Sequence, residues 1–313
     1  MQTKLTELLG IRHPVIQGGM AWIADARLAA AVSEAGGLGV ISAMNADAEW
    51  VRTQIRLCRT LTKKPFGVNI MLMSPYAEQV AKTVCEERVP VVTTGAGSPA
   101  RYMRDWKAAD IKVLPVVAST AFAKLAARAG ADAVVAEGCE SGGHVGELTT
   151  MALVPQVVDA VEIPVVAAGG IGDGRGLAAS LALGACGVQM GTRFLVAKEC
   201  GVSDAYKRMV LSAKDISTTV TGRRLGHPVR AIRTEYTNEY SRLEASADCK
   251  DSDLERFGVG SLRRAVEGDT QTGCFLAGQI AGMVKEEQTA AEIVEDVVSV
   301  AEEALRSGLN FLG

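Results

Sequence analysis

The chain has 313 residues, 48% of them hydrophobic and 22% charged, with a formal net charge of −3. This composition is typical of a globular protein with a large buried core and gives no overall case for nucleic-acid binding. No apolar run approaches the roughly 20 residues of a membrane-spanning helix, the first residues lack the apolar core of a secretory signal, and the seven cysteines show no zinc-type spacing. We therefore expect a cytoplasmic protein with no metal site and no nucleic-acid or membrane partner.

Short apolar segments alternate with helical segments along the first two-thirds of the chain. The predicted strands are residues 14–17, 38–42, 66–71, 90–94, 112–117, 133–136, 164–168 and 187–190. The predicted helices between them include residues 26–34, 48–61, 76–87, 120–129 and 176–183. Eight strands joined by helical crossovers indicate a (β/α)₈ TIM barrel. An open doubly wound sheet is the alternative, but the first strand ends in Gly18-Gly19-Met20 and lacks the G-x-G-x-x-G fingerprint of that fold.

The pattern also divides the chain into three parts. Residues 1–194 contain all of the predicted barrel strands. Residues 195–288 are more charged and less periodic, which indicates a smaller cap or inserted subdomain. Residues 289–313 begin with an amphipathic helix, which we expect to pack back on the barrel.

Two predicted strands end in small residues that suit a phosphate group. Barrels of this type bind phosphate in the loops after strands seven and eight, which here contain Ala168-Gly169-Gly170 and Gly191-Thr192. Glycine lets a phosphate approach backbone N–H groups, and a helix starting near Asp173 or Gly174 would add its positive end. One such loop is better explained as a simple chain turn. The two loops together predict a phosphate site.

Other strand ends should surround the rest of the ligand. Gly18, Gly19 and Met20 would present backbone after the first strand, while Asn45 follows the second strand and Asn69 lies within the third. An asparagine at this rim can donate and accept hydrogen bonds, as a flavin ring requires. Asn45 could equally cap the following helix. Glu137, at the end of the sixth strand, could bind the cofactor, brace the next loop or be a solvated carboxylate.

His144 is the best candidate for an acid or base. It is one of three histidines, it follows Gly142 and Gly143 in the loop after the sixth strand, and imidazole titrates near neutral pH. A lone histidine is more often structural, but this position favours catalysis. We expect His227 to order a turn and Cys139 to be a bystander.

These motifs together resemble the FMN-dependent nitronate monooxygenase superfamily over nearly the whole chain. The shared segments are residues 16–22 (IQGGMAW), 35–39 (AGGLG), 64–71 (KPFGVNIM), 140–146 (ESGGHVG), 167–171 (AAGGI) and 188–194 (VQMGTRF). Within the superfamily, the chain is more similar to the flavin-type enoyl-acyl-carrier-protein reductases of bacterial fatty-acid synthesis. That similarity lies in residues 71–75 (MLMSP), 91–97 (VVTTGAG), 146–151 (GELTTM), 226–230 (GHPVR) and 277–282 (AGQIAG). One small departure is Ser98, where an asparagine is expected before Pro99.

The resemblance implies a reaction in two half-steps. NADH or NADPH reduces FMN, and a hydride then passes to the β-carbon of a trans-2-enoyl thioester, with His144 as the expected catalytic proton donor. The residues do not distinguish NADH from NADPH, and a monovalent cation is a further candidate cofactor. The expected cofactor-binding residues are Gly18, Gly19, Met20, Asn45, Asn69, Glu137, Gly143, Ala168, Gly169, Gly170, Met190, Gly191 and Thr192.

The charge distribution suggests a partner. Residues 195–234 carry eight basic and three acidic residues, a local balance of +5 on a chain whose net charge is −3. Acyl carrier proteins are acidic, so this segment would steer them to the site. A solvated surface or an internal ion-pair network explains the segment equally well. A homodimer is the expected assembly.

Two other functions compete with the reductase. A nitronate monooxygenase would use the same flavin scaffold but reoxidise it with oxygen and an alkyl nitronate. A non-catalytic FMN- or phosphate-binding barrel is less favoured, because His144 is expected to lie beside the flavin.

Overall fold

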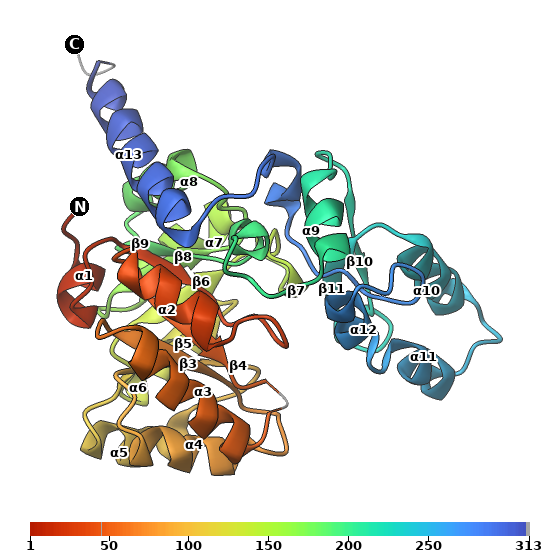
Figure 1. The fold of residues 1–313 in the computed structure, drawn as a ribbon, viewed down its shortest axis with the longest axis horizontal. Coiled ribbons are helices and arrows are strands. Elements are labelled where there is room, and N and C mark those ends of the chain that lie inside the picture. Colours follow the sequence, from red (N-terminus) through yellow and green to blue (C-terminus); the bar gives the residue numbers. More distant parts are fainter. Residues whose placement is uncertain (45, 311–313) are drawn as a thin grey trace.

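The barrel predicted from the sequence is confirmed in the computed structural model, which describes residues 1–44 and 46–310 (Figure 1). All eight barrel strands run parallel, in the order β1-β9-β8-β6-β5-β4-β3-β2. Their bounds are β1 Val15–Gln17, β2 Gly39–Ser42, β3 Phe66–Met71, β4 Val91–Gly95, β5 Lys112–Val117, β6 Val134–Glu137, β8 Val165–Ala168 and β9 Gly187–Met190.

The sheet closes between its first and last strands. Ile16 of β1 forms an isolated parallel bridge with Leu38, and the Leu38 N–H donates to the Val15 carbonyl at 2.9 Å. The Gln17 side chain continues this pairing, because its Oε1 accepts from the Val40 N–H at 3.1 Å and its Nε2 donates to the Val40 carbonyl at 3.3 Å. The buried Gln17 amide thus pairs with the β2 backbone as a neighbouring strand would, at the seam where β1 meets β2. The sheet is closed, so the open doubly wound alternative is wrong.

Replacing Gln17 with leucine should destabilise the barrel by about 2–5 kcal/mol, because the buried N–H and carbonyl of Val40 would both lose their partner. Urea denaturation of the two proteins measures the change. The matched control is Gln156→Leu, since the exposed Gln156 amide donates only to a carbonyl of its own helix. Equal losses in the two variants would show that the Gln17 amide does not close the seam.

The barrel interior is a packed apolar core at its lower end. Ile16, Leu38, Val40 and other inward-facing strand residues form one cluster with Leu5 and Leu9 of α1 (Lys4–Leu9). A Cβ added at Gly187 would lie 2.7 Å from the Pro14 carbonyl oxygen and 2.5 Å from Leu5 Cδ2, so glycine is needed where α1 meets β9. Helix α1 therefore plugs the end of the barrel at which the strands begin.

Four helices of the outer ring start at short polar caps. The side chains of Asp25, Asp47, Ser119 and Asp173 each accept a backbone N–H at the start of their helix. The ring consists of α2 (Ala26–Glu34), α3 (Ala48–Leu61), α4 (Ala77–Glu86), α5 (Ala100–Ala108), α6 (Thr120–Arg128), α7 (Thr150–Ala160) and α8 (Gly174–Ala182). No helix in the described residues is long and apolar enough to cross a membrane.

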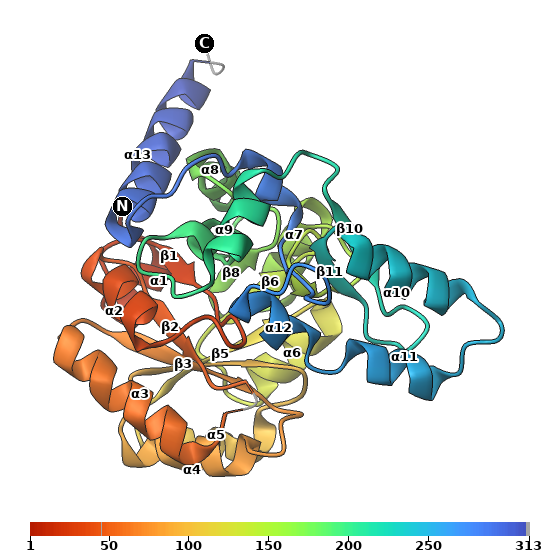
Figure 2. The same ribbon diagram turned by 45° about the vertical axis from the view of Figure 1, so that its right-hand side comes forward.

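The chain after β9 forms a group of small elements on one side of the barrel (Figures 1 and 2). They are η1 (Thr192–Val196), α9 (Asp204–Leu211), β10 (Thr218–Thr221), β11 (Val229–Ile232), α10 (Glu235–Ala245), α11 (Asp251–Gly258), α12 (Ser261–Glu267) and η2 (Gln279–Met283). Strands β10 and β11 form a separate antiparallel sheet with β7 (Gly143–His144), which comes from the loop after β6. This sheet joins the subdomain to the barrel.

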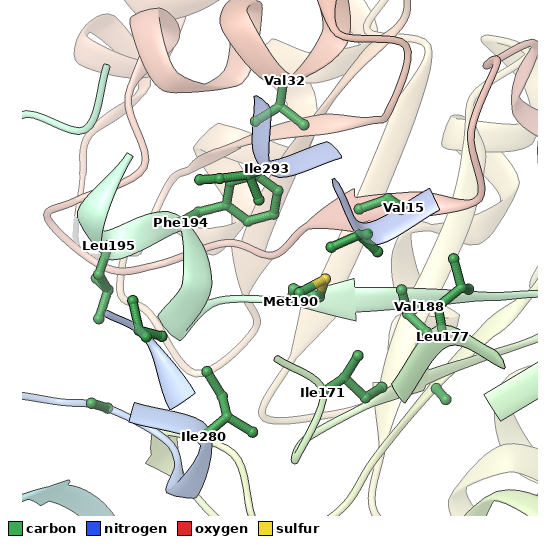
Figure 3. Close-up of a cluster of buried hydrophobic side chains, with 14 of the residues drawn as sticks. Val15, Val32, Ile171, Leu177, Val188, Met190, Phe194, Leu195, Ile280 and Ile293 are labelled. Atoms are coloured by element: carbon green, nitrogen blue, oxygen red, sulfur yellow. The ribbon is translucent and has the colours of Figure 1, made fainter. Parts of the chain in front are cut away.

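The last helix, α13 (Ala290–Leu309), packs against α8 and α2 and extends beyond the barrel (Figure 2). Its Ile293 enters a buried cluster with Val188, Met190, Phe194 and Ile280, which Figure 3 shows in close-up. A Cβ added at Gly174 would lie 2.4 Å from the Val297 carbonyl oxygen, so the small start of α8 allows close packing of the two helices.

Candidate active site

A ring of polar side chains lies at the upper end of the barrel, where the strands end. Strand register pairs Ser42 with Asn69 and Asn69 with Thr93, and it places Glu137 and Gln189 on either side of Ala168. Residues paired in this way point to the same face of the sheet, and alternation along the strands makes that face the barrel interior. The barrel is thus apolar below and polar at its mouth.

Two of these polar atoms have no partner among the described residues. They are Oγ of Ser42 and Oε1 of Gln189. A buried polar atom without a hydrogen bond costs about 1–3 kcal/mol, so such atoms are rarely left unpaired. Asn69 Nδ2, in contrast, donates to Thr93 Oγ1 at 2.9 Å. Unsatisfied groups at one rim indicate a binding site for a polar ligand.

The loop after β1 approaches this ring closely. A Cβ added at Gly19 would lie 2.4 Å from the Asn69 Cβ, and one added at Gly18 would lie 3.0 Å from the Gln189 side chain. The Gly18 N–H donates to the Met190 carbonyl at 3.0 Å. The predicted residues Gly18, Gly19 and Asn69 therefore lie together, and Gln189 joins them.

The two predicted phosphate loops have free backbone donors. Gly169 and Gly170 adopt φ angles of +86° and +70°, which favour glycine. In the described part of the chain, the N–H groups of Gly169, Gly170 and Gly191 donate to no backbone or side-chain acceptor. The Thr192 hydroxyl is buried and accepts from the Gly278 N–H at 2.8 Å. Adjacent free N–H groups at two strand ends can bind an anion.

His144 lies in the loop after β6 and is held by the small sheet. It pairs with Val229 of β11, and the next residue, Val145, donates its N–H to the Pro228 carbonyl at 3.0 Å. The residue is exposed, while its ring lies close enough to neighbouring protein that burial, and secondarily the charge of His227, lowers the pKa of His144 below 6.5. An imidazole on a braced strand at this end of the barrel can exchange a proton with a bound ligand.

Arg230 braces this loop, although from the sequence it was named only within the motif 226–230 and among the basic residues of segment 195–234. Its buried guanidinium donates to the Cys139 carbonyl at 3.0 and 3.2 Å, and burial lowers its pKa. The sequence did contain a signal for this role, because Arg230 is a charged residue within the otherwise apolar strand β11. Ser42 and Gln189 were missed for a different reason, since nothing in the sequence shows which strand residues face inward.

Three other predicted residues have distinct positions. The Met190 side chain points away from the interior ring into the buried cluster of Figure 3, so only its backbone lies at the mouth. Met20 lies near Gly191, with its Sδ 3.7 Å from an added Cβ there, and Gly143 has a φ of +78° beside His144. The prediction for Asn45 falls outside the described residues.

Replacing Glu137 with glutamine should remove a pH dependence of stability. Burial raises the pKa of the Glu137 carboxyl to about 7 from an ordinary value of 4.5, and the nearby Ser141 hydroxyl opposes the rise. Between these two pH values the folded protein holds a proton that the unfolded chain has lost, so the free energy of unfolding falls as the pH rises.

We expect the FMN-free wild type to lose about 1–3 kcal/mol over that interval relative to Glu137→Gln, measured by urea denaturation. Parallel pH profiles for the two proteins would contradict the raised pKa.

The barrel has its relatives among the oxidoreductases. The family model of nitronate monooxygenase matches residues 2–83 and 72–299. The structure is similar to that of FabK from Thermotoga maritima, with a TM-score of 0.97, 48% identity and 99% coverage of both chains. A carboxyl-CoA dehydrogenase of Rhodococcus jostii, named for a hydroxy-methyl-oxo-octahydroindene carboxyl-CoA, is 36% identical over 96% of each chain. A probable nitronate monooxygenase of Staphylococcus saprophyticus is 34% identical over 97% of this chain and 99% of its own. The chain belongs to the nitronate monooxygenase family.

Proposed function

We propose that the protein is a flavin-dependent enoyl-acyl-carrier-protein reductase that uses NADH or NADPH. The observation that carries this choice is the similarity to FabK over the whole chain, at 48% identity against 34–36% for the curated relatives. The Rhodococcus relative is named for a carboxyl-CoA compound, which is also a thioester. Both comparisons favour a thioester substrate.

The residues present fit FMN. The unpaired polar atoms of Ser42 and Gln189 suit the polar edge of its ring system, and the glycines at positions 18 and 19 let the loop after β1 pack against Gln189 and Asn69 at this rim. The free N–H groups of the loops after β8 and β9 suit its phosphate. Bound FMN would supply hydride transfer between the nicotinamide and the enoyl thioester.

The protein's own residues would supply the proton and stabilise the charge that develops on the substrate. Saturating the enoyl double bond requires a proton at the α-carbon of the thioester. His144, held by β11 and Arg230, is the residue proposed to donate it. Burial raises the pKa of Glu137 to about 7, so this residue can present a neutral carboxyl to the flavin at the same end of the barrel.

A nitronate monooxygenase is the second candidate, supported by the family match and by the Staphylococcus relative. In that reaction His144 would act as a base or hold an anion. The two functions differ in the oxidant that accepts electrons from the enzyme.

One experiment separates the two candidates. NADH and NADPH oxidation is followed anaerobically with crotonyl thioester, and oxygen consumption is followed with an alkyl nitronate. The reductase proposal expects thioester-dependent oxidation without oxygen. Oxygen consumption with nitronate, without anaerobic oxidation of NADH or NADPH, would establish the nitronate monooxygenase. If both activities are absent, the remaining function is that of a non-catalytic flavin-binding barrel.

We further propose that an acyl carrier protein docks on part of the basic segment 195–234. Half of its basic residues are engaged within the protein: Lys198 with Glu292, Lys207 with Glu287, Arg224 with Asp251, and Arg230 with the Cys139 carbonyl. Arg223 and Arg233 are exposed and form no ion pair within the described residues. These two remain available to an acidic partner.

Combining Arg223→Glu with Arg233→Glu should raise the KM for enoyl-acyl carrier protein about tenfold and leave the KM for a short coenzyme A thioester unchanged. Arg224 is excluded from this test because it also donates to the Ser246 and Cys249 carbonyls, so its loss would disturb the loop. The control is Lys124→Glu with Arg128→Glu on exposed α6, which changes the charge equally. Equal changes for both substrates would remove the docking proposal.

A further inference from the structure

The Thr150 hydroxyl lies directly behind the phosphate loop after β8. Its Oγ1 is 2.8 Å from the Gly169 carbonyl oxygen, 3.1 Å from the Ala168 carbonyl oxygen and 3.0 Å from Glu140 Oε2. A hydroxyl has one proton to donate, and the Gly169 carbonyl is the nearest of the three acceptors. The Ala168 carbonyl is also satisfied by the Gly138 N–H at 2.9 Å.

Thr150 is itself held in place by Glu140. The Thr150 N–H lies 3.0 Å from each Glu140 carboxylate oxygen, at the start of α7. The Glu140 carbonyl accepts from the Gln279 N–H at 2.9 Å, and the neighbouring Gly278 N–H donates to Thr192. This chain of hydrogen bonds connects the loop after β8, the loop that carries His144 and the start of η1.

The geometry of the peptide bond shows what this contact does. In a trans peptide, the carbonyl of one residue and the N–H of the next point in opposite directions. Fixing the Gly169 carbonyl against Thr150 therefore directs the Gly170 N–H away from Thr150. The Gly169 N–H is directed in the same way by the Ala168 carbonyl, which the Gly138 N–H holds. These are the donors that have no partner among the described residues.

We propose that Thr150 is a positioning residue that orients the Gly170 N–H group toward the phosphate of FMN, without touching the cofactor. This inference rests on the proposed FMN site and assigns a role to a residue outside it. Glu140 holds Thr150 in place.

The test compares FMN with riboflavin, which lacks the phosphate. Apo-protein is titrated with each flavin and binding is followed by flavin fluorescence. We expect Thr150→Val, of nearly equal shape, to raise the dissociation constant of FMN about tenfold, the effect of one buried hydrogen bond left unmade, and to leave that of riboflavin unchanged. Thr150→Ser keeps the hydroxyl and should restore the affinity for FMN.

Thr149→Val is the matched control, because the adjacent Thr149 is exposed and its side chain makes no capping hydrogen bond. An equal loss for FMN and riboflavin in Thr150→Val, or a loss that Thr150→Ser does not restore, would overturn the role in phosphate positioning. The role would also be overturned if Thr150→Val bound FMN as tightly as Thr149→Val does. Failure of wild-type protein to bind either flavin would contradict the proposed cofactor instead, so the two failures are distinguishable.

Discussion

Replacing His144 with alanine should slow turnover of crotonyl thioester by about 10²- to 10⁴-fold while bound FMN is retained. In the described residues the imidazole makes no hydrogen bond to another side chain, and the backbone of β7 is held by β11. The variant should therefore fold normally and lose only its proton donor. Steady-state kinetics and the visible flavin spectrum measure the two properties.

His227→Ala provides the control, because His227 is exposed, lies near His144 and is expected only to order a turn. Its turnover should stay close to that of the wild type. Unchanged turnover in His144→Ala would remove the residue from the chemistry.

The pH dependence gives an independent signature of the same role. Because burial lowers the pKa of His144 below 6.5, the protonated form decreases as the pH rises through that value. A proton donor therefore predicts a rate of thioester reduction that falls with rising pH, and His144→Ala should lack that part of the profile.

Replacing Gly169 with alanine should weaken FMN binding by at least about a hundredfold. Gly169 has a φ of +86°, and a Cβ there would lie 2.6 Å from the Gly138 carbonyl oxygen and 3.1 Å from both the Gly138 nitrogen and Thr150 Oγ1. Backbone atoms cannot move aside as a flexible side chain can. The left-handed conformation and the overlap together should cost about 2–5 kcal/mol.

Gly10→Ala separates these two causes, since Gly10 has a φ of +65° but no atom within 4 Å of an added Cβ. It should lose only about 1–2 kcal/mol of stability and retain full FMN affinity. Thermal unfolding and flavin titration of both variants provide the measurements. If Gly169→Ala binds FMN as Gly10→Ala does, the loop after β8 does not form the phosphate site.

The barrel could be predicted from the sequence because its strands are short, apolar and buried on both faces. The patterns at residues 26–34 and 48–61 also match α2 and α3. Helix α1 was not predicted, since it contains six residues and its burial against Gly187 appears only in three dimensions. Helices α5 and α7 were likewise not identified.

The candidate site was predicted as positions along the chain and not as side-chain directions. Gln189 and Met190 are adjacent on β9, yet Gln189 faces the interior ring and Met190 faces the outer apolar cluster. One residue of register reverses the face, and register depends on pairing with β8 and β1. The hydrogen bonds from Gly278 to Thr192 and from Gln279 to Glu140 join segments that are far apart in the sequence, so no local pattern could have indicated them.

The plug formed by α1 has a consequence for the order of events in catalysis. With Leu5 and Leu9 packed into the barrel floor, small molecules can reach the polar ring only from the end where the strands finish. Under the proposed function, nicotinamide and enoyl thioester must therefore enter by the same opening. If both react at the same face of the flavin, they compete for one position, and excess of either substrate should inhibit the reaction of the other.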